Sequence, residues 1–97
     1  QIDFGIKLYD RWVSDIQRFA YVLKEGETEA PVDIQFYWES SKAGNRAALA
    51  AMKPGVKGIA IDAAQRILMK AAKSEYVMWS TGHPVGYVAH DVGPNLG

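Results

Sequence analysis

The most regular pattern of apolar and polar positions runs from residue 6 to residue 24, in the stretch IKLYDRWVSDIQRFAYVLK. Apolar side chains recur there every three or four residues, the spacing of one face of an amphipathic helix. The stripe consists of Ile6, Tyr9, Val13, Ile16, Ala20 and Leu23, widened by Trp12 and Phe19. Asp3 precedes this stretch as an N-cap, and Gly26 and Pro31 follow it as helix-terminating residues. We therefore predict a helix over residues 6–24.

Strict alternation replaces the helical spacing in VDIQFYW, residues 32–38. The alternate apolar positions are Val32, Ile34, Phe36 and Trp38. A two-residue period of this kind is typical of a strand with one buried face. We predict a strand over residues 32–38, with Tyr37 on its polar face as a candidate contact for a partner.

Two further helices are predicted in the middle of the chain. The residues ESS offer an N-cap for KAGNRAALAAMK, and Pro54 and Gly55 stop that helix. Residues 56–61 either extend towards a cap at Asp62 or already belong to the next helix, and we favour a helix that begins near Gly58. Ten alanines lie between residues 43 and 72, and their small side chains allow two helices, or a helix and a sheet, to approach closely.

The C-terminal stretch EYVMWSTGHPVGYVAHDV is predicted to form a β-hairpin around GHPV. The expected fold is a single α+β domain over residues 1–97, with the element order α-β-α-α-β-β. Its small three-stranded sheet combines the strand near residues 32–38 with the hairpin near residues 75–91. Two or three helices are expected to pack against this sheet.

Both histidines of the chain lie in this C-terminal stretch. A hairpin with Thr81 opposite Gly86 places His83 at the tip and His90 four residue pairs away, roughly 13 Å along the strands at about 3.3 Å per residue. Two ligands of one zinc ion must both lie within about 2.1 Å of it, so we expect no shared metal site and no cofactor. His90 and Asp91 remain the candidate catalytic residues, because an adjacent carboxylate stabilises a protonated imidazole.

Several functional classes are excluded or disfavoured by the composition and motifs. The chain has no cysteine, so disulfides, thiolate metal sites and thiol nucleophiles are excluded. Phosphate-binding loops, nucleophile elbows and the His-Glu-x-x-His zinc motif do not occur. No apolar run approaches the ~20 residues of a membrane-spanning helix, so no transmembrane segment is expected. These absences favour a protein that is not an enzyme.

Charge is segregated along a chain whose net charge is zero. Residues 1–40 contain four basic and eight acidic side chains, whereas residues 41–73 contain seven basic side chains and one acidic side chain. Several of the basic residues share helical faces at three- and four-residue spacing. The candidate binding residues on these faces are Lys42, Arg46, Arg66, Lys70 and Lys73.

The favoured interpretation is a non-enzymatic interaction or assembly protein that binds a protein partner or further subunits through its acidic and basic surfaces. One alternative is a nucleic-acid-binding module that uses the basic helices. The other alternative is a small hydrolase or secreted effector that uses His90 and Asp91. The first residue, Gln1, fits a processed or secreted chain as well as a trimmed or internal fragment.

Overall fold

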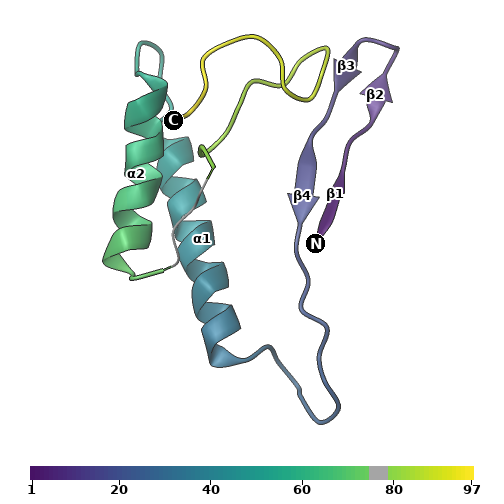
Figure 1. Cartoon of the computed structure of the whole chain (residues 1–97), viewed down its shortest axis with the longest axis vertical. Coiled ribbons are helices and arrows are strands. Elements are labelled where there is room, and N and C mark those ends of the chain that lie inside the picture. Colours follow the sequence, from purple (N-terminus) through teal and green to yellow (C-terminus); the bar gives the residue numbers. More distant parts are fainter. Residues whose placement is uncertain (75–78) are drawn as a thin grey trace.

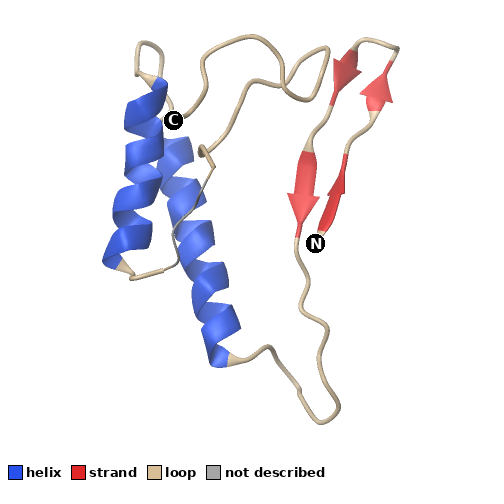
Figure 2. Cartoon of the chain, in the orientation of Figure 1, coloured by secondary structure: helices blue, strands red, loops and turns tan. Residues whose placement is uncertain are grey.

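The computed structural model describes residues 1–74 and 79–97. The described chain begins with four short strands, β1 (Ile2–Phe4), β2 (Lys7–Leu8), β3 (Trp12–Val13) and β4 (Ile16–Arg18) (Figure 1). Two helices follow, α1 (Val32–Ala51) and α2 (Gly58–Ala71). The C-terminal residues form loops that extend from the helices to the strands (Figure 2). The predicted α+β class is therefore confirmed, although several elements lie elsewhere than expected.

The four strands form one interrupted antiparallel hairpin. β1 pairs with β4, and β2 pairs with β3 in the same register, with Ile2 opposite Arg18 and Leu8 opposite Trp12. Tyr9 and Asp10 form the turn with φ angles of 51° and 53°. Positive φ at both central residues is the geometry of a type I′ turn, whose twist matches that of the flanking strands.

The predicted helix over residues 6–24 is wrong, because most of this stretch belongs to the hairpin and the rest is a loop. The sequence fits both a helical and a strand spacing. Apolar side chains at Ile2, Phe4, Ile6 and Leu8 alternate with polar residues or glycine, which is the two-residue spacing of a strand. The alternation extends N-terminal to the segment that carries the helical stripe. Cross-strand pairing in the two segments of the hairpin satisfies backbone groups that the helix would have satisfied internally.

The predicted strand over residues 32–38 is also wrong, because these residues form the first two turns of α1. Pro31 lies at the N-cap, its carbonyl accepts the Gln35 N–H at 3.0 Å, and Asp33 places a negative charge in the first turn. No described strand pairs with these residues. Without a partner strand, these residues satisfy more of their backbone hydrogen bonds as part of the following helix than as an isolated strand. The residues ESS, expected to cap that helix, therefore lie inside α1.

The helices α1 and α2 run antiparallel and pack through small side chains (Figure 1). Ser40, Gly44 and Ala48 form the buried stripe of α1, which faces buried Ile61 and Met69 of α2. This packing confirms the close helix approach expected from the alanine-rich sequence. The predicted start of the second helix near Gly58 is confirmed as well.

The C-terminal hairpin predicted near residues 75–91 is not seen in its described part, and residues 75–78 lie outside the described residues. Instead, Thr81 N–H donates to the Leu96 carbonyl and Leu96 N–H donates to the Gly82 carbonyl, each at 3.0 Å. The expected three-stranded sheet is replaced by the two-stranded pairings of the N-terminal hairpin.

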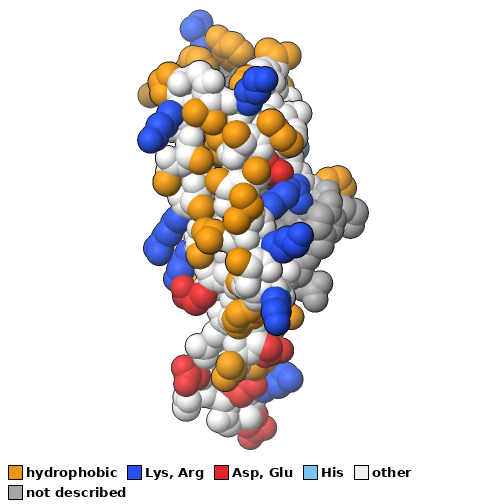
Figure 3. Space-filling view, turned by 90° about the vertical axis from the view of Figure 1, so that its left-hand side faces the viewer, with side chains coloured by type: hydrophobic (Ala, Val, Ile, Leu, Met, Phe, Trp, Pro, Cys, Tyr) orange, Lys and Arg blue, Asp and Glu red, His pale blue; other side chains and the backbone are white. Residues whose placement is uncertain are grey.

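Much apolar surface remains exposed on the described residues. The outer side of the helical pair carries a band of hydrophobic side chains with lysines and arginines along its edges (Figure 3). Ile59 and Ile67 of α2 are 62% and 67% exposed. Neither described helix has the combination of length and hydropathy that a membrane crossing requires.

A buried carboxylate attaches the C-terminal segment to α2. Asp62 is only 4% exposed and accepts hydrogen bonds from Arg66 Nε, from the Thr81 backbone N–H at 3.1 Å and from the Thr81 hydroxyl at 2.7 Å. The hydrogen bond from Arg66 lowers the pKa of Asp62, and the bonds from Thr81 act in the same direction against the opposing effect of burial. The last residue, Gly97, lies beside the same carboxylate.

We predict that this carboxylate contributes to the acid sensitivity of the fold. Its pKa is lower in the folded state than in the unfolded state, so its stabilisation is present above about pH 4 and is lost as the pH falls through the folded pKa. Urea unfolding at a series of pH values should show this loss in the wild type and a shallower acid dependence in Asp62→Asn. Identical pH profiles for the two proteins would contradict the assignment.

Candidate metal centre

Asp15 lies at the interruption between the two paired segments of the hairpin. The shared register places Gly5 opposite Asp15, on the same face as the pairs Asp3–Gln17 and Lys7–Val13. Ser14 fixes the interruption, because its N–H donates to the Ile6 carbonyl at 2.9 Å and its hydroxyl accepts the Ile6 N–H at 3.1 Å. A Cβ atom on residue 5 would lie 2.1 Å from the Ser14 carbonyl oxygen, so only glycine fits here.

The two histidines lie on a folded loop. The Asp91 N–H donates to the Pro84 carbonyl at 3.1 Å, while the Asp91 carboxylate accepts the N–H groups of Tyr87 and Val92 at 2.7 and 2.8 Å. These contacts close the loop. The imidazole rings of His83 and His90 stack, with centroids 4.0 Å apart and planes inclined by 28°.

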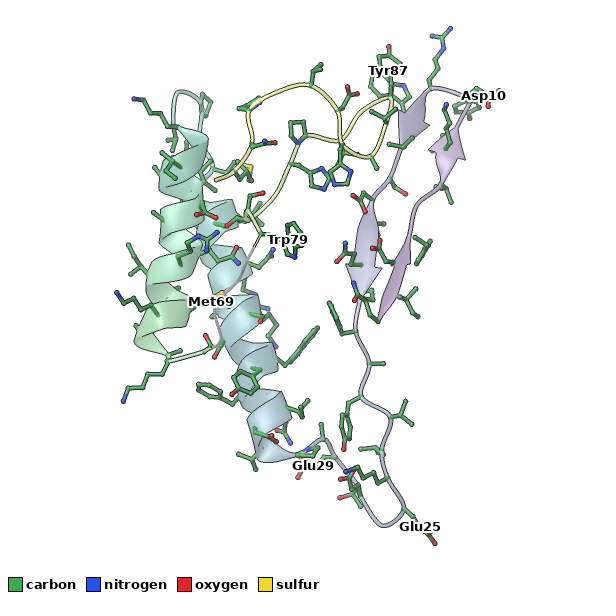
Figure 4. All side chains as sticks on the ribbon, in the orientation of Figure 1. Asp10, Glu25, Glu29, Met69, Trp79 and Tyr87 are labelled. Carbon is green, nitrogen blue, oxygen red and sulfur yellow. The ribbon has the colours of Figure 1, made fainter. Side chains whose placement is uncertain are left out.

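The same loop is attached to the hairpin next to Asp15. The Val13 N–H donates to the Gly86 carbonyl at 2.9 Å, and Trp12 stacks on Tyr87 with ring centroids 5.0 Å apart. Tyr87 therefore lies at the turn end of the hairpin, where Asp10 is also found (Figure 4). This attachment brings the two histidines to the face of the hairpin that carries Asp15.

Asp15, His83 and His90 converge into one group. Each offers one potential ligand atom, and the three atoms all lie within 4.8 Å of one another. Asp15 Oδ2 is 3.3 Å from His83 Nε2, and the two side chains are only 18% and 29% exposed. The expectation that the two histidines lie too far apart to share a metal ion is therefore wrong, because it rested on a hairpin register that the chain does not adopt.

The hydrogen bonds of His83 suit a metal ligand. Its Nδ1 lies 3.0 Å from the Pro84 carbonyl oxygen, which can only accept, so Nδ1 carries the proton in the neutral ring. The lone pair of Nε2 in this tautomer faces the Asp15 carboxylate, and a cation held between the two acceptors would relieve their repulsion. Two ligands at about 2.1 Å in a tetrahedral site lie about 3.4 Å apart, close to the observed separation. An imidazole bonded to a carbonyl through its other nitrogen is the usual arrangement of a metal-bound histidine.

A cleft of about 480 Å³ opens beside this group. One wall is formed by residues 3–7 and 13–15 with Gln17 of the hairpin, and the other by His83, Ala89 and His90 of the loop. Its volume lies within the range of small-ligand sites. Gly5 contributes backbone alone to this lining, next to Asp15.

Of the two candidate catalytic residues predicted from the sequence, only one belongs to the cluster of Asp15, His83 and His90. His90 belongs to it, whereas both carboxylate oxygens of Asp91 accept backbone N–H groups within the loop. The bonds from Val92 and Tyr87 lower the pKa of Asp91. Asp91 therefore shapes the loop and is not among the three clustered residues.

The candidate binding residues lie on the helices and, for Lys73, in the turn after α2, away from the cleft lining. Lys42 pairs with Glu39 at 2.7 Å, and Arg66 bonds to Asp62 and to the Trp79 carbonyl. Arg46, Lys70 and Lys73 are exposed, as is Tyr37, which meets the ring of Phe36 edge-on. The structure thus spreads these residues over the helical pair and does not gather them into one site.

Asp15 is the residue that sequence reasoning missed. Nothing in the local sequence WVSDIQ distinguishes it from a solvent-exposed aspartate. Recognition of the alternating pattern over residues 2–8 would have indicated a hairpin, and the pairing register then places Asp15 on the same face as Asp3 and Lys7. Its proximity to the histidines depends on contacts between distant segments.

Comparison with known protein families identifies the class of protein. Residues 1–97 match the model of metallopeptidase family M24. No curated protein and no solved structure matches the chain. The chain therefore belongs to this metallopeptidase family. This assignment overturns the favoured interpretation of a non-enzymatic assembly protein and supports the hydrolase alternative.

We predict that Gly5→Ala disturbs the connection between β3 and β4 that carries Asp15. The new methyl group would collide with the Ser14 carbonyl, and overpacking of this kind costs about 1–3 kcal/mol. Urea denaturation should report that loss, whereas the exposed substitution Arg11→Ala in the same hairpin should change stability by no more than about 0.5 kcal/mol. Equal stability of Gly5→Ala and the wild type would contradict the close approach.

Proposed function

We propose that the chain forms a metal-dependent peptidase site in which Asp15, His83 and His90 hold a divalent transition-metal ion. The observation that carries this proposal is the convergence of one carboxylate and two imidazoles, from segments about 70 residues apart in the sequence, beside an open cleft. Membership of a metallopeptidase family supports the same chemistry.

The three donors fit a catalytic rather than a structural ion. Imidazole and carboxylate ligands suit zinc and neighbouring transition metals. Catalytic zinc sites keep three protein ligands and leave a further position open, whereas structural sites are closed by four. The donor set carries one negative charge with neutral imidazoles, which partly balances a divalent cation.

Hydrolysis adds water across the peptide bond: a carbon–oxygen bond forms, the carbon–nitrogen bond breaks, and the leaving nitrogen gains a proton. A bound divalent ion supplies Lewis-acid polarisation of the reacting carbonyl and water. The chain itself supplies orientation. The Pro84 carbonyl fixes the His83 tautomer, Asp15 contributes the negative charge, and the cleft walls hold a short stretch of peptide next to these groups.

We predict that zinc stabilises the folded chain, because its ligands come from distant segments that are brought together only on folding. At a free zinc concentration 100 times the Kd, the free energy of unfolding should rise by about 2.7 kcal/mol. The increase, measured by thermal or urea unfolding, should be lost in Asp15→Asn. Asp10→Asn removes an equal charge at the exposed turn, where asparagine tolerates the positive φ, and should retain it. No stabilisation of the wild type by zinc, cobalt or manganese would overturn the proposal.

We further predict that the chain hydrolyses peptides once a divalent metal ion has been added. Short unblocked peptides should release new amino groups, measured by an amine-reactive dye. Asp15→Asn and His83→Ala should lower the rate by more than the roughly 10–100-fold typical of substitutions outside the ligand shell. Asp10→Asn should keep the wild-type rate. Rates that are equal in the wild type and Asp15→Asn would assign the hydrolysis to another source.

A further inference from the structure

The segment that precedes His83 is held on two sides. On one side, α2 binds it at two points: Asp62 accepts the Thr81 backbone N–H and hydroxyl, and Arg66 Nη2 donates to the Trp79 carbonyl at 2.9 Å. On the other side, Leu96 exchanges backbone hydrogen bonds with Thr81 and Gly82. Residues 79–82 therefore lie between the helix and the C-terminal residues.

The C-terminal residues depend on α2 for their own position. Gly58, at the start of α2, has no side chain, and a Cβ atom there would lie 1.9 Å from the Asn95 carbonyl oxygen. Only a glycine allows Asn95 and Leu96 to lie this close to the helix. The helix therefore supports the segment before His83 both directly through Asp62 and indirectly through Leu96.

Because Thr81 is held in place, the His83 imidazole two residues later is also restricted in position. Gly82 is held by the bond between its carbonyl and the Leu96 N–H. His83 precedes Pro84, which confines its backbone to extended conformations. Its ring is then fixed by the Nδ1 contact with the Pro84 carbonyl. Few rotations remain between the Thr81 hydroxyl and the Nε2 atom that faces Asp15.

We propose that Asp62 is a positioning residue for this site, acting through the Thr81 hydroxyl to set the place of His83 relative to Asp15 and His90. This inference rests on the proposed function, since it assigns Asp62 a role towards the metal ligands without contact with the metal. Asp62 is suited to this role because it is buried and accepts hydrogen bonds from Arg66 of α2 and from Thr81. Outer groups that orient a metal ligand typically contribute 10–100-fold to metal affinity.

The test compares four substitutions. Thr81→Val removes the hydroxyl but keeps the shape and the backbone N–H, and Thr81→Ser keeps the hydroxyl. Ser74→Ala is the matched control, because it removes a hydroxyl bond of 2.8 Å to the Met69 carbonyl at the other end of α2. Asp62→Asn is the companion variant at the carboxylate. Zinc affinity is measured by calorimetry, and the nuclear Overhauser contact between the His83 and His90 rings is measured in the metal-free protein.

We expect Thr81→Val to weaken zinc binding about 10-fold or more and to reduce the ring contact, with the same direction of change in Asp62→Asn. Thr81→Ser and Ser74→Ala should keep wild-type values. Unchanged affinity and ring contact in Thr81→Val would overturn the positioning role, and so would an equal loss in Ser74→Ala. If the wild type binds no metal, the proposed function fails, whereas the ring contacts of the metal-free variants still decide whether Asp62 positions His83.

Discussion

The hydrogen bond from the Val13 N–H to the Gly86 carbonyl joins the hairpin to the histidine loop, and the candidate site depends on it. It lies two residues from Asp15 and is accompanied by the stack of Trp12 on Tyr87. Without this attachment, Asp15 would lie on an isolated two-stranded hairpin, a structure of marginal stability in water. The histidine loop is therefore held at both ends. Asp62 of α2 binds the segment before His83, and Val13 of the hairpin binds Gly86.

Much of the helical half of the fold could be predicted from the sequence. The alanine-rich composition allowed either two helices or a helix and a sheet to pack closely, and the start at Gly58 was predicted correctly. The N-terminal half could not be resolved by periodicity, because Ile6, Val13 and Ile16 fit a helical stripe while Ile2, Phe4 and Leu8 fit a strand. Likewise, alternation in VDIQFYW predicts a strand, yet a strand requires a partner, and partners are determined by contacts between distant segments.

The candidate site was only partly accessible to sequence reasoning, for a related reason. His90 was identified, but a regular hairpin separated it from His83, and Asp15 went unnoticed. Two local features oppose that hairpin: the Asp91 carboxylate accepts backbone N–H groups that a ladder would use, and the Asp91 N–H donates to the Pro84 carbonyl. They indicate a folded loop, although not where it attaches. That Asp15 lies 3.3 Å from His83 follows only from the tertiary contacts.

The central claim is that one ion is bound by side chains from both ends of the chain. X-ray absorption spectroscopy at the zinc edge, on the stoichiometric complex of the 97-residue chain, tests it most directly. The account predicts scattering from two imidazoles and a carboxylate oxygen, at about 2.0–2.2 Å from the ion. A coordination sphere with one imidazole or none would contradict the convergence of Asp15, His83 and His90.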